Sequence, residues 1–199
     1  MVHLPNHDIH LSDERIRLRP FTDADFDVVA RWFANPEVMH YADSAEHPRY
    51  TREEIEGIYR GVAEEWGGLL FIIETMKGQV IGETWLQQMN LERGQKQPPD
   101  RAWRIDISIG EKEYWECGYG TRAVWLLMRY AFEKLSADRV AGMAVFEFNE
   151  RSQRMFQSCG MRLVRRIPDT VTRNGKLFAE VDLEITRGEW LEGQPRPCA

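Results

Sequence analysis

RIDISIGEKEYWECGYG, residues 104–120, is the stretch of sequence that decides the fold. Residues 104–109 alternate between polar side chains and isoleucine, which is the period-two pattern of a strand with one apolar face. The stretch ends in Gly118-Tyr119-Gly120, and from Thr121 onward apolar residues recur at the spacing of a helix that buries one face. The sequence therefore predicts a strand, a loop that carries glycines and a helix, in that order.

The predicted loop and helix start together form an anion site. The first backbone N–H groups of a helix have no partner inside the helix, and the helix dipole adds positive charge there. Gly118 and Gly120 let a phosphate approach the backbone without a Cβ in the way. We therefore expect a phosphate or pyrophosphate ligand at the helix start, while the glycines alone also fit a plain tight turn.

The spacing of these glycines excludes two common phosphate-binding loops. The sequence has no G-x-x-x-x-G-K-[ST] motif, so a nucleoside-triphosphate loop is not expected. The third position after Gly120 is Ala123, so the G-x-G-x-x-G fingerprint of dinucleotide-binding folds is also absent.

Composition bounds the protein class. The chain has 199 residues, 43% hydrophobic and 29% charged, which suits one globular domain. A net charge of -6 favours cationic substrates and disfavours nucleic acid and anionic membranes as partners. No apolar run reaches the length of a membrane span, and no metal-ligand cluster is recognisable. Cysteines 117, 159 and 198 are an odd, widely spaced set, which predicts a reducing, cytoplasmic location.

Two ordered motifs carry a family resemblance. ISIGEKEYWECGYGTRA, residues 107–123, resembles the acetyl-coenzyme A signature of the GNAT superfamily, the GCN5-related N-acetyltransferases, written [R/Q]-x-x-G-x-[G/A]. Trp115 replaces the usual Arg or Gln, as in the branch with the Rim-type ribosomal-protein N-terminal acetyltransferases. FEFNERSQRMFQSCGM, residues 146–161, is similar to the second signature, N-x-R-[AS]-x-x-x-[YF]-x-x-x-G-[FM]. The resemblance spans roughly residues 13 to 187.

The resemblance implies the α/β (α+β) GNAT fold, a mixed, twisted sheet of about seven strands flanked by about four helices. We expect a flexible N-terminal arm at 1–13, one acetyltransferase domain at 14–187 and a C-terminal tail at 188–199. Capping boxes at Thr22 and Thr51 predict two helix starts, and Asn35-Pro36 is read as the end of the first helix. The expected strands cover 15–21, 69–75, 80–88, 104–109, 139–148, 162–167 and 178–186, and a long polar loop covers 90–100.

The resemblance also implies the coenzyme site. The pantetheine arm of acetyl-coenzyme A is expected along the central strand, with a backbone N–H there donating to the thioester carbonyl. The pyrophosphate is expected at the loop, and the next helix supplies further contacts. The expected coenzyme-binding residues are Ile107, Ser108, Ile109, Trp115, Cys117, Gly118, Tyr119, Gly120, Thr121, Asn149, Arg151 and Phe156.

Acetyl transfer to an amine needs a base, because an ammonium has no lone pair. Asp106 is the first candidate, since I-D-I-S-I-G resembles the D-Q-[SF]-[LI] segment of the aminoglycoside 6′-N-acetyltransferases, in which the Asp contacts the amine. Glu83 is the second candidate, and a pair between Asp106 and Arg104 is the alternative reading. Many family members have Tyr at the position of Phe156, and Phe cannot donate a proton. Either Ser108, Tyr119 or water is therefore expected to protonate the thiolate, or the thiolate leaves without assistance.

The sequence does not decide which class of molecule accepts the acetyl group. Residues 41–51 resemble the substrate loop of aminoglycoside 6′-N-acetyltransferases, which favours a small cationic amine such as an aminoglycoside or polyamine, bound by Tyr41, Asp43, Trp85 and Asp106. F-E-F-N-E-R and T-R-N-G-K resemble instead the Rim-type enzymes, whose acceptor is a peptide N-terminus. The alternative to an enzyme is a module that binds acyl-coenzyme A without turning it over. The family habit of dimerisation through the last strands allows for a homodimer.

Overall fold

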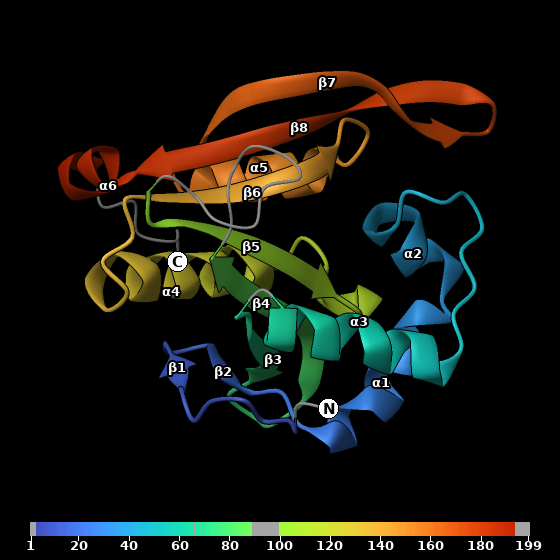
Figure 1. Cartoon of the computed structure of the whole chain (residues 1–199), viewed down its shortest axis with the longest axis horizontal. Coiled ribbons are helices and arrows are strands. Elements are labelled where there is room, and N and C mark those ends of the chain that lie inside the picture. The colour runs from blue at the N-terminus through green and yellow to red at the C-terminus, as the bar shows by residue number, and fades with distance from the viewer. Residues whose placement is uncertain (1–2, 66, 89–99, 194–199) are drawn as a thin grey trace.

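The computed structural model describes residues 3–65, 67–88 and 100–193 as an eight-stranded sheet with helices on both faces (Figure 1). The strand order is β1-β2-β3-β4-β5-β6-β8-β7, and every neighbouring pair is antiparallel except β5 and β6. The strands are β1 (Leu11–Ser12), β2 (Ile16–Pro20), β3 (Leu69–Thr75), β4 (Val80–Gln88), β5 (Ala102–Ile109), β6 (Arg139–Phe146), β7 (Arg162–Arg173) and β8 (Lys176–Thr186).

Six α-helices accompany the sheet in the described ranges. They are α1 (Phe26–Phe33), α2 (Pro36–Ala42), α3 (Arg52–Glu65), α4 (Tyr119–Glu133), α5 (Glu150–Ser158) and α6 (Arg187–Gly193). The expected mixed α/β fold is confirmed, with eight strands and six α-helices described where about seven and four were expected. The expected loop at 90–100 lies, apart from Asp100, outside the described residues.

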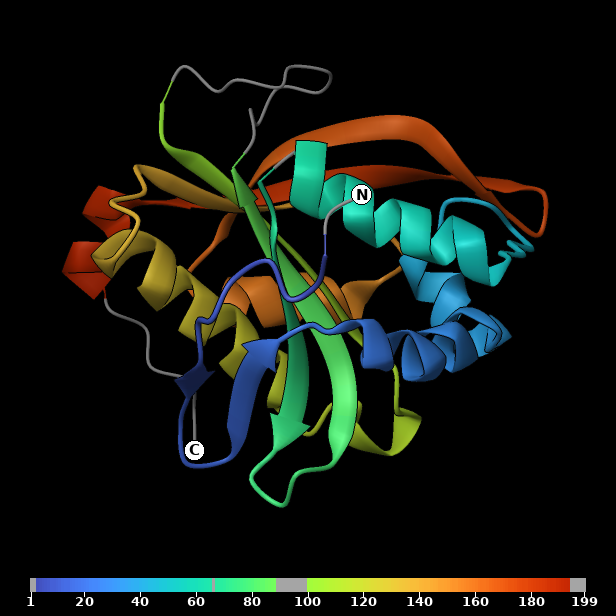
Figure 2. The same cartoon turned by 60° about the horizontal axis from the view of Figure 1, so that its bottom comes forward.

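The helices divide between the two faces of the sheet (Figures 1 and 2). On one face, α4 buries Val124, Leu127 and Phe132 in a cluster with apolar side chains of the central strands. On the other face, helices α1 to α3 form a second cluster with Leu70 and Ile72 of β3. Side chains alternate between the faces along each strand, so neighbouring residues of β5 serve different layers.

Helix α2 is an element that the sequence analysis did not expect. Helix α1 ends at Phe33, just before Asn35-Pro36 as expected, but Pro36 is also the first residue of α2. The Asn35 side chain accepts the N–H of Glu37 at 3.0 Å and so caps the new helix. Proline fits the first turn of a helix because the N–H it lacks would have no helical partner there.

The first and last described residues pack on the domain. Leu4 is buried, the His7 ring contacts the Leu70 carbonyl at 3.0 Å, and β1 pairs with β2. Residues 4–12 thus lie on the sheet, and the flexibility expected for 1–13 stays a prediction. At the other end, Trp190 of α6 is buried and stacks on Phe132 at a centroid distance of 5.3 Å, so residues 188–193 also belong to the domain.

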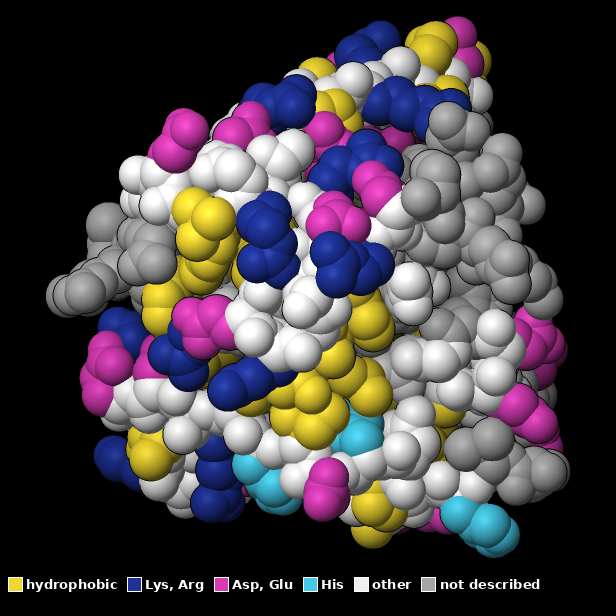
Figure 3. All heavy atoms as spheres, turned by 60° about the vertical axis from the view of Figure 1, so that its left-hand side comes forward, with side chains coloured by type: hydrophobic (Ala, Val, Ile, Leu, Met, Phe, Trp, Pro, Cys, Tyr) yellow, Lys and Arg dark blue, Asp and Glu magenta, His cyan; other side chains and the backbone are white. Residues whose placement is uncertain are grey.

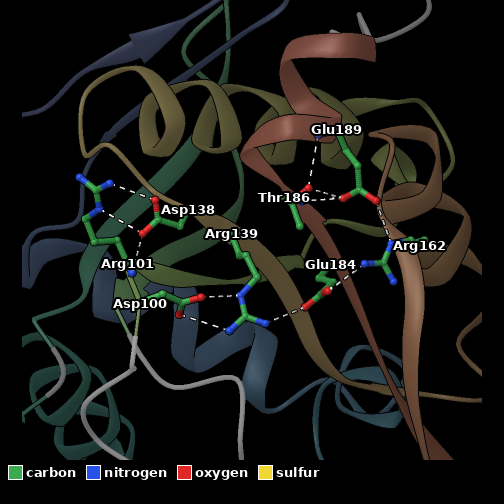
Figure 4. A network of polar contacts seen from close by, with 8 residues as sticks. All are labelled: Asp100, Arg101, Asp138, Arg139, Arg162, Glu184, Thr186 and Glu189. Carbon is green, nitrogen blue, oxygen red and sulfur yellow. Dashed lines mark hydrogen bonds and ion pairs between the residues drawn. The ribbon is translucent and has the colours of Figure 1, made fainter.

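Ion pairs join the strand ends at which the parallel strands β5 and β6 begin (Figure 4). Arg139 at the start of β6 pairs with Asp100 before β5 and with Glu184 of β8, at 2.8 and 3.5 Å. Arg162 at the start of β7 extends the chain of contacts to Glu184 and to Glu189 of α6. Figure 3 shows the side of the molecule at the left of Figure 1, where basic and acidic side chains lie next to one another. We call this end of the β5–β6 pair the closed end.

None of the helices in the described ranges has both the length and the apolar character that a membrane span requires.

Candidate active site

The parallel strands β5 and β6 separate soon after they begin. Only residues 102–104 of β5 pair with β6, opposite residues 139–141. Strand β5 stays paired with β4 as far as Ile109. Strand β6 carries an irregularity between Gly142 and Val145, where Ala144 has a φ of 56°. The Ala144 N–H donates to Asp182 Oδ1 at 2.8 Å, which holds this bulge. A bulge bends its strand, so the two strands diverge and leave an opening, here called the open end.

The backbone of β5 faces this opening at every second residue. Thr84 Oγ1 donates to the Asp106 carbonyl at 2.6 Å, so Asp106 points its carbonyl toward β4. Trp115 Nε1 donates to the Ile109 carbonyl at 2.6 Å from the other side. In an antiparallel pair, alternate residues point both backbone groups toward the partner strand or away from it. The N–H and C=O of Ile107 therefore face the opening, beyond the last described pair with β6.

A cavity of about 430 Å³ lies at the open end and extends to the start of α4. Gly118 precedes α4 with a φ of 82° and no side chain caps the helix, so its first amides face the cavity uncapped. The lining residues are Val38, Tyr41, Ala42, Ile107, Ser108, Ile109, Tyr114, Trp115, Glu116, Gly118, Tyr119, Gly120, Thr121, Asn149, Arg151, Ser152, Arg154, Met155 and Ser158. A free helix N-terminus beside a channel along a strand edge suits an elongated ligand that ends in phosphates.

Guanidinium groups add positive charge beside this cavity. Arg151 stacks between the rings of Tyr41 and Trp115, with its Cζ 4.4 and 4.1 Å from the two centroids. Arg15, which precedes β2, lies over the Tyr119 ring at 4.8 Å, and its Nη1 is 3.9 Å from the position that a Cβ on Gly118 would take. Within the described ranges neither arginine forms an ion pair with a carboxylate. Both charges are therefore available to an anionic ligand.

A second cavity, of about 380 Å³, adjoins the first across β5. The two share Tyr41, Ile107, Ser108 and Asn149, so they meet where β5 and β6 diverge. The second cavity is lined by Trp32, Phe33, Val38, Met39, Tyr41, Ala42, Asp43, Ser44, Tyr50, Ile58, Tyr59, Glu83, Trp85, Arg104, Ile105, Asp106, Ile107, Ser108, Met143, Ala144, Val145, Phe146, Asn149, Ser152, Phe156 and Glu180. It combines aromatic rings with four carboxyl groups and one guanidinium group.

Glu83 and Asp106 differ in environment although both line the second cavity. The pKa of Glu83 is raised to about 8, mainly by burial and also by the negative charge of Asp106, while the Tyr59 hydroxyl opposes the rise. Asp106 pairs with Arg104 at 2.5 Å and accepts the Trp85 Nε1–H at 2.9 Å. The Asp106–Arg104 pair that the sequence left open is thus present. The two carboxyl groups therefore differ in kind: Glu83 is a buried acid with a raised pKa, and Asp106 is ion-paired.

Comparison with known proteins decides the family. A family model described as the acetyltransferase (GNAT) domain matches residues 15–162, which is most of the chain. The chain belongs to the GNAT acetyltransferase family.

Solved GNAT acetyltransferases share the fold. Spermidine N-acetyltransferase from Vibrio cholerae, solved with CoA and spermine, aligns with a TM-score of 0.74 and 18% identity, over 90% of this chain and 99% of that chain. An aminoglycoside acetyltransferase in complex with coenzyme A aligns at 0.73 and 17%, with the same coverage. A GNAT-family acetyltransferase from Bacillus anthracis aligns at 0.71 and 16%, again over 90% and 99%. At these identities the likeness is one of fold.

Most residues expected at the GNAT coenzyme site line the first cavity. The exceptions are Cys117, whose exposed thiol contacts the Trp115 carbonyl at 3.3 Å, and Phe156, which lines the second cavity instead. Phe156 packs against Gly142 so closely that a Cβ there would lie 2.6 Å from the ring. The four residues expected to bind the acceptor, Tyr41, Asp43, Trp85 and Asp106, all line the second cavity, together with Glu83 and Ser108.

Sequence reasoning missed several residues at the site of this GNAT chain. Arg15 comes from a segment more than 100 residues before the glycine loop, and nothing in the local pattern signals that contact. Glu180 and Tyr59 enter the second cavity from β8 and α3, which are distant from β5 in sequence. The side of β8 that carries Glu180 could have been found, because polar residues at 180, 182 and 184 alternate with apolar ones. Among the described residues, no three His, Cys, Asp or Glu side chains gather as a metal site.

Proposed function

We propose that this protein transfers an acetyl group from acetyl-coenzyme A to the primary amine of a small cationic acceptor. The observation that carries the proposal is the meeting of the two cavities at Ser108, with Glu83 directly across from it as its partner in the β4–β5 register. One cavity fits a long phosphate-bearing coenzyme and the other an amine. Their junction is where an acetyl group would pass between them.

The coenzyme site would use backbone groups and helix polarity. The pantetheine arm would lie along β5 and bond to the N–H and C=O of Ile107. The pyrophosphate would meet the first amides of α4 beside Gly118 and Gly120, where a Cβ on Gly120 would lie 2.7 Å from Met155 Sδ. Arg15 would face the phosphates. The solved structures of the spermidine and aminoglycoside enzymes with coenzyme A support this ligand class.

Glu83 is the base in this proposal, in place of Asp106. A general base works best when its pKa lies near the operating pH, and the Glu83 pKa of about 8 meets that condition. Asp106 is held by Arg104 and Trp85, so its carboxylate orients the acceptor rather than accepting its proton. The ammonium of the acceptor would lose a proton to Glu83, directly or through water.

Acetyl transfer then proceeds by addition of the amine and loss of the thiolate. The free amine forms a bond to the thioester carbon, and a backbone N–H of β5 donates to the carbonyl oxygen while it carries negative charge. Collapse of this intermediate breaks the carbon–sulfur bond, and the thiolate takes the second amine proton through Ser108 or water. Phe156 cannot supply this proton. Coenzyme A and the acetylated amine are the products.

The second cavity favours a cationic acceptor. Asp43, Asp106 and Glu180 contribute negative charge, and Arg104 is the cation among the residues that line it. Aromatic rings such as those of Tyr41 and Trp85 bind cations through their faces. The neighbours that act on spermidine and aminoglycosides are consistent with such an acceptor.

The rim of this cavity favours a small acceptor over a protein N-terminus. Asp43 and Ser44 at the rim are tied to the β7–β8 hairpin, because Arg173 donates to both of their carbonyls. The N–H of Asn174 also donates to Glu46. A rim fastened in this way leaves less room for a folded protein than a free loop would.

The experiment that tests the proposal is thiol release from acetyl-coenzyme A with spermidine, kanamycin-type aminoglycosides, and short peptides that start with Ser or Ala. We expect turnover with a polyamine or aminoglycoside, and kcat that rises with pH toward about 8 as Glu83 loses its proton. Glu83→Gln should lower kcat by about 100-fold or more, as removal of a general base does. Asp106→Asn should act mainly on KM for the amine.

Three outcomes separate the alternatives. Turnover with peptides alone would favour the Rim-type reading. Tight acetyl-coenzyme A binding without turnover on any amine would favour the non-catalytic module. An Asp106→Asn variant that loses kcat while Glu83→Gln keeps it would return the role of base to Asp106.

A further inference from the structure

A third cavity adjoins the other two at Tyr41 and lies between α2 and the tip of the β7–β8 hairpin. It measures about 400 Å³ and is lined by His40, Tyr41, Phe148, Arg173, Asn174, Lys176 and Phe178. We call it the hairpin cavity. It shares only Tyr41 with the lining of the other two cavities. Figure 1 shows the hairpin tip above α2, at the end of β7 and β8 opposite to α6.

The lining of the hairpin cavity carries positive charge and no carboxylate. Arg173 is 4% exposed, and its two Nη groups donate to the carbonyls of His40, Asp43 and Ser44. Its Nε is buried and has no hydrogen-bond partner within the described chain. Burial of a charge is unfavourable unless a counter-charge compensates it, and carbonyl dipoles do so only in part.

Lys176 adds a second positive charge. Its Nζ lies 5.0 Å from the centroid of the Phe178 ring, and it forms no ion pair among the described residues. Glu147 pairs with Arg166 at 2.8 Å and feels the charge of Lys176 without pairing with it, and Glu46 accepts the N–H of Asn174. In a protein of net charge -6, a lining with two cations and no acid selects for an anion.

The rest of the lining is aromatic. Phe148 and Phe178 meet at a centroid distance of 5.1 Å in an edge-on arrangement, and the His40 ring lies 5.1 Å from Phe148. The pKa of His40 is lowered by burial and by the charge of Arg173, so its ring adds an apolar wall at neutral pH. Aromatic walls of this kind favour a planar apolar group, which packs face to face or edge to face.

We propose that the hairpin cavity binds a small aromatic carboxylate. The ring of the ligand packs against Phe148 and Phe178, and its carboxylate pairs with Lys176 and neutralises the buried charge of Arg173. The hairpin cavity is distinct from the second cavity, which we call the acceptor cavity; that cavity carries acidic residues and selects for the opposite charge. The proposal is independent of the reaction, because it concerns binding alone.

The test is calorimetric titration of the whole chain with 2-naphthoate. We expect saturable binding that weakens about tenfold, or about 1.4 kcal/mol, in Lys176→Ala. Lys77→Ala is the matched control, because Lys77 lies in the turn of the other hairpin, between β3 and β4. Phe178→Leu is a milder second variant that keeps an apolar side chain, and it should weaken binding by removing the aromatic wall. Near-ultraviolet circular dichroism verifies that each variant is folded.

Two further titrations test where the ligand binds and whether its charge is needed. The neutral isostere 2-naphthylmethanol should bind at least tenfold more weakly than 2-naphthoate, and Trp85→Phe in the acceptor cavity should leave naphthoate binding unchanged. The proposal is overturned if wild-type protein shows no saturable binding, if Lys176→Ala binds as well as Lys77→Ala, or if the neutral isostere binds equally. Loss of binding in Trp85→Phe would move the ligand to the acceptor cavity and also overturn it.

Discussion

The two ends of the β5–β6 pair do opposite things with the same parallel strands. At the closed end, Arg139 joins the strands through ion pairs with Asp100 and Glu184, and backbone pairing is continuous (Figure 4). At the open end, the bulge at Ala144 turns β6 away, and Ile107, which pairs with Thr84 of β4, has no described partner on β6. The comparison teaches that the site is made by interrupting a sheet rather than by adding a loop to it. The closed end keeps the interruption from spreading.

The largest expected effect concerns the buried charge at the open end. The pKa of Glu83 is about 8 in the folded protein and near its ordinary value of 4.5 when unfolded. A carboxyl group with a raised folded pKa contributes its full stability below the unfolded pKa, and that stability is lost as the pH rises toward the folded pKa. Relative to Glu83→Gln, wild type should therefore lose about 3 kcal/mol of unfolding free energy between about pH 5.5 and 8.5, at about 1.4 kcal/mol per unit.

Urea unfolding of both proteins at several pH values measures this difference, because other titrating groups are common to the two and cancel. A constant difference across that range would show that Glu83 ionises normally in the folded protein. Glu83 would then be buried in its charged form at neutral pH.

Breaking the bulge is the next largest test of the comparison. Asp182→Ala removes the acceptor of the Ala144 N–H, which should cost about 1–3 kcal/mol of stability and raise KM for acetyl-coenzyme A. Asp182→Asn is the control, because its amide oxygen can still accept this hydrogen bond. Chemical denaturation and steady-state kinetics measure the two effects. Equal KM values for all three proteins would mean that the bulge does not shape the coenzyme cavity.

Charge at the open end predicts a smaller effect on binding. Arg15→Ala should weaken coenzyme A binding about tenfold, which corresponds to about 1.4 kcal/mol. Because Arg15 lies beside Gly118, the same loss is expected for 3′-dephospho-coenzyme A and none for pantetheine. Arg17→Ala is the matched control, since Arg17 is already paired with Glu74. Calorimetry that finds a loss confined to coenzyme A would place Arg15 at the 3′-phosphate instead.

The smallest effect is expected at the closed end. Arg139→Ala removes ion pairs with the partly exposed Asp100 and the buried Glu184, which Arg162 still pairs, and should lower the unfolding free energy by about 1 kcal/mol. KM for the coenzyme should stay unchanged, since backbone pairing still holds the strands. A KM that rises as much as in Asp182→Ala would show that the two ends are not independent.

Much of this architecture was predictable from local sequence. The bounds of β3 and β4 coincide with the predicted ranges 69–75 and 80–88, because apolar runs separated by a short turn have few alternative readings. The capping boxes at Thr22 and Thr51 are present, with reciprocal hydrogen bonds to Asp25 and Glu54. The glycine loop and the two GNAT signatures identify the family for a similar reason: their information is contained in a few consecutive residues.

The remaining features depend on contacts between distant segments. Asn35-Pro36 follows the end of α1 and also begins α2, and the local sequence pattern predicted only the first of these. The preference for Glu83 over Asp106 as base depends on burial and on the neutralising contact with Arg104, neither of which is visible in a strand pattern. The hairpin cavity combines α2 with residues about 135 positions later, so no sequence window contains it.

The isoleucines, the polar side chains and the backbone of strand β5 have three different roles. Its isoleucines pack on the α4 side, its polar side chains Arg104, Asp106 and Ser108 face the acceptor cavity, and in the proposed mechanism its backbone holds the coenzyme. Backbone hydrogen bonds persist when side chains are replaced. In that mechanism, substitutions at positions 104 and 106 would alter which amine is accepted without removing the acetyl donor, so acceptor preference would change by single substitutions.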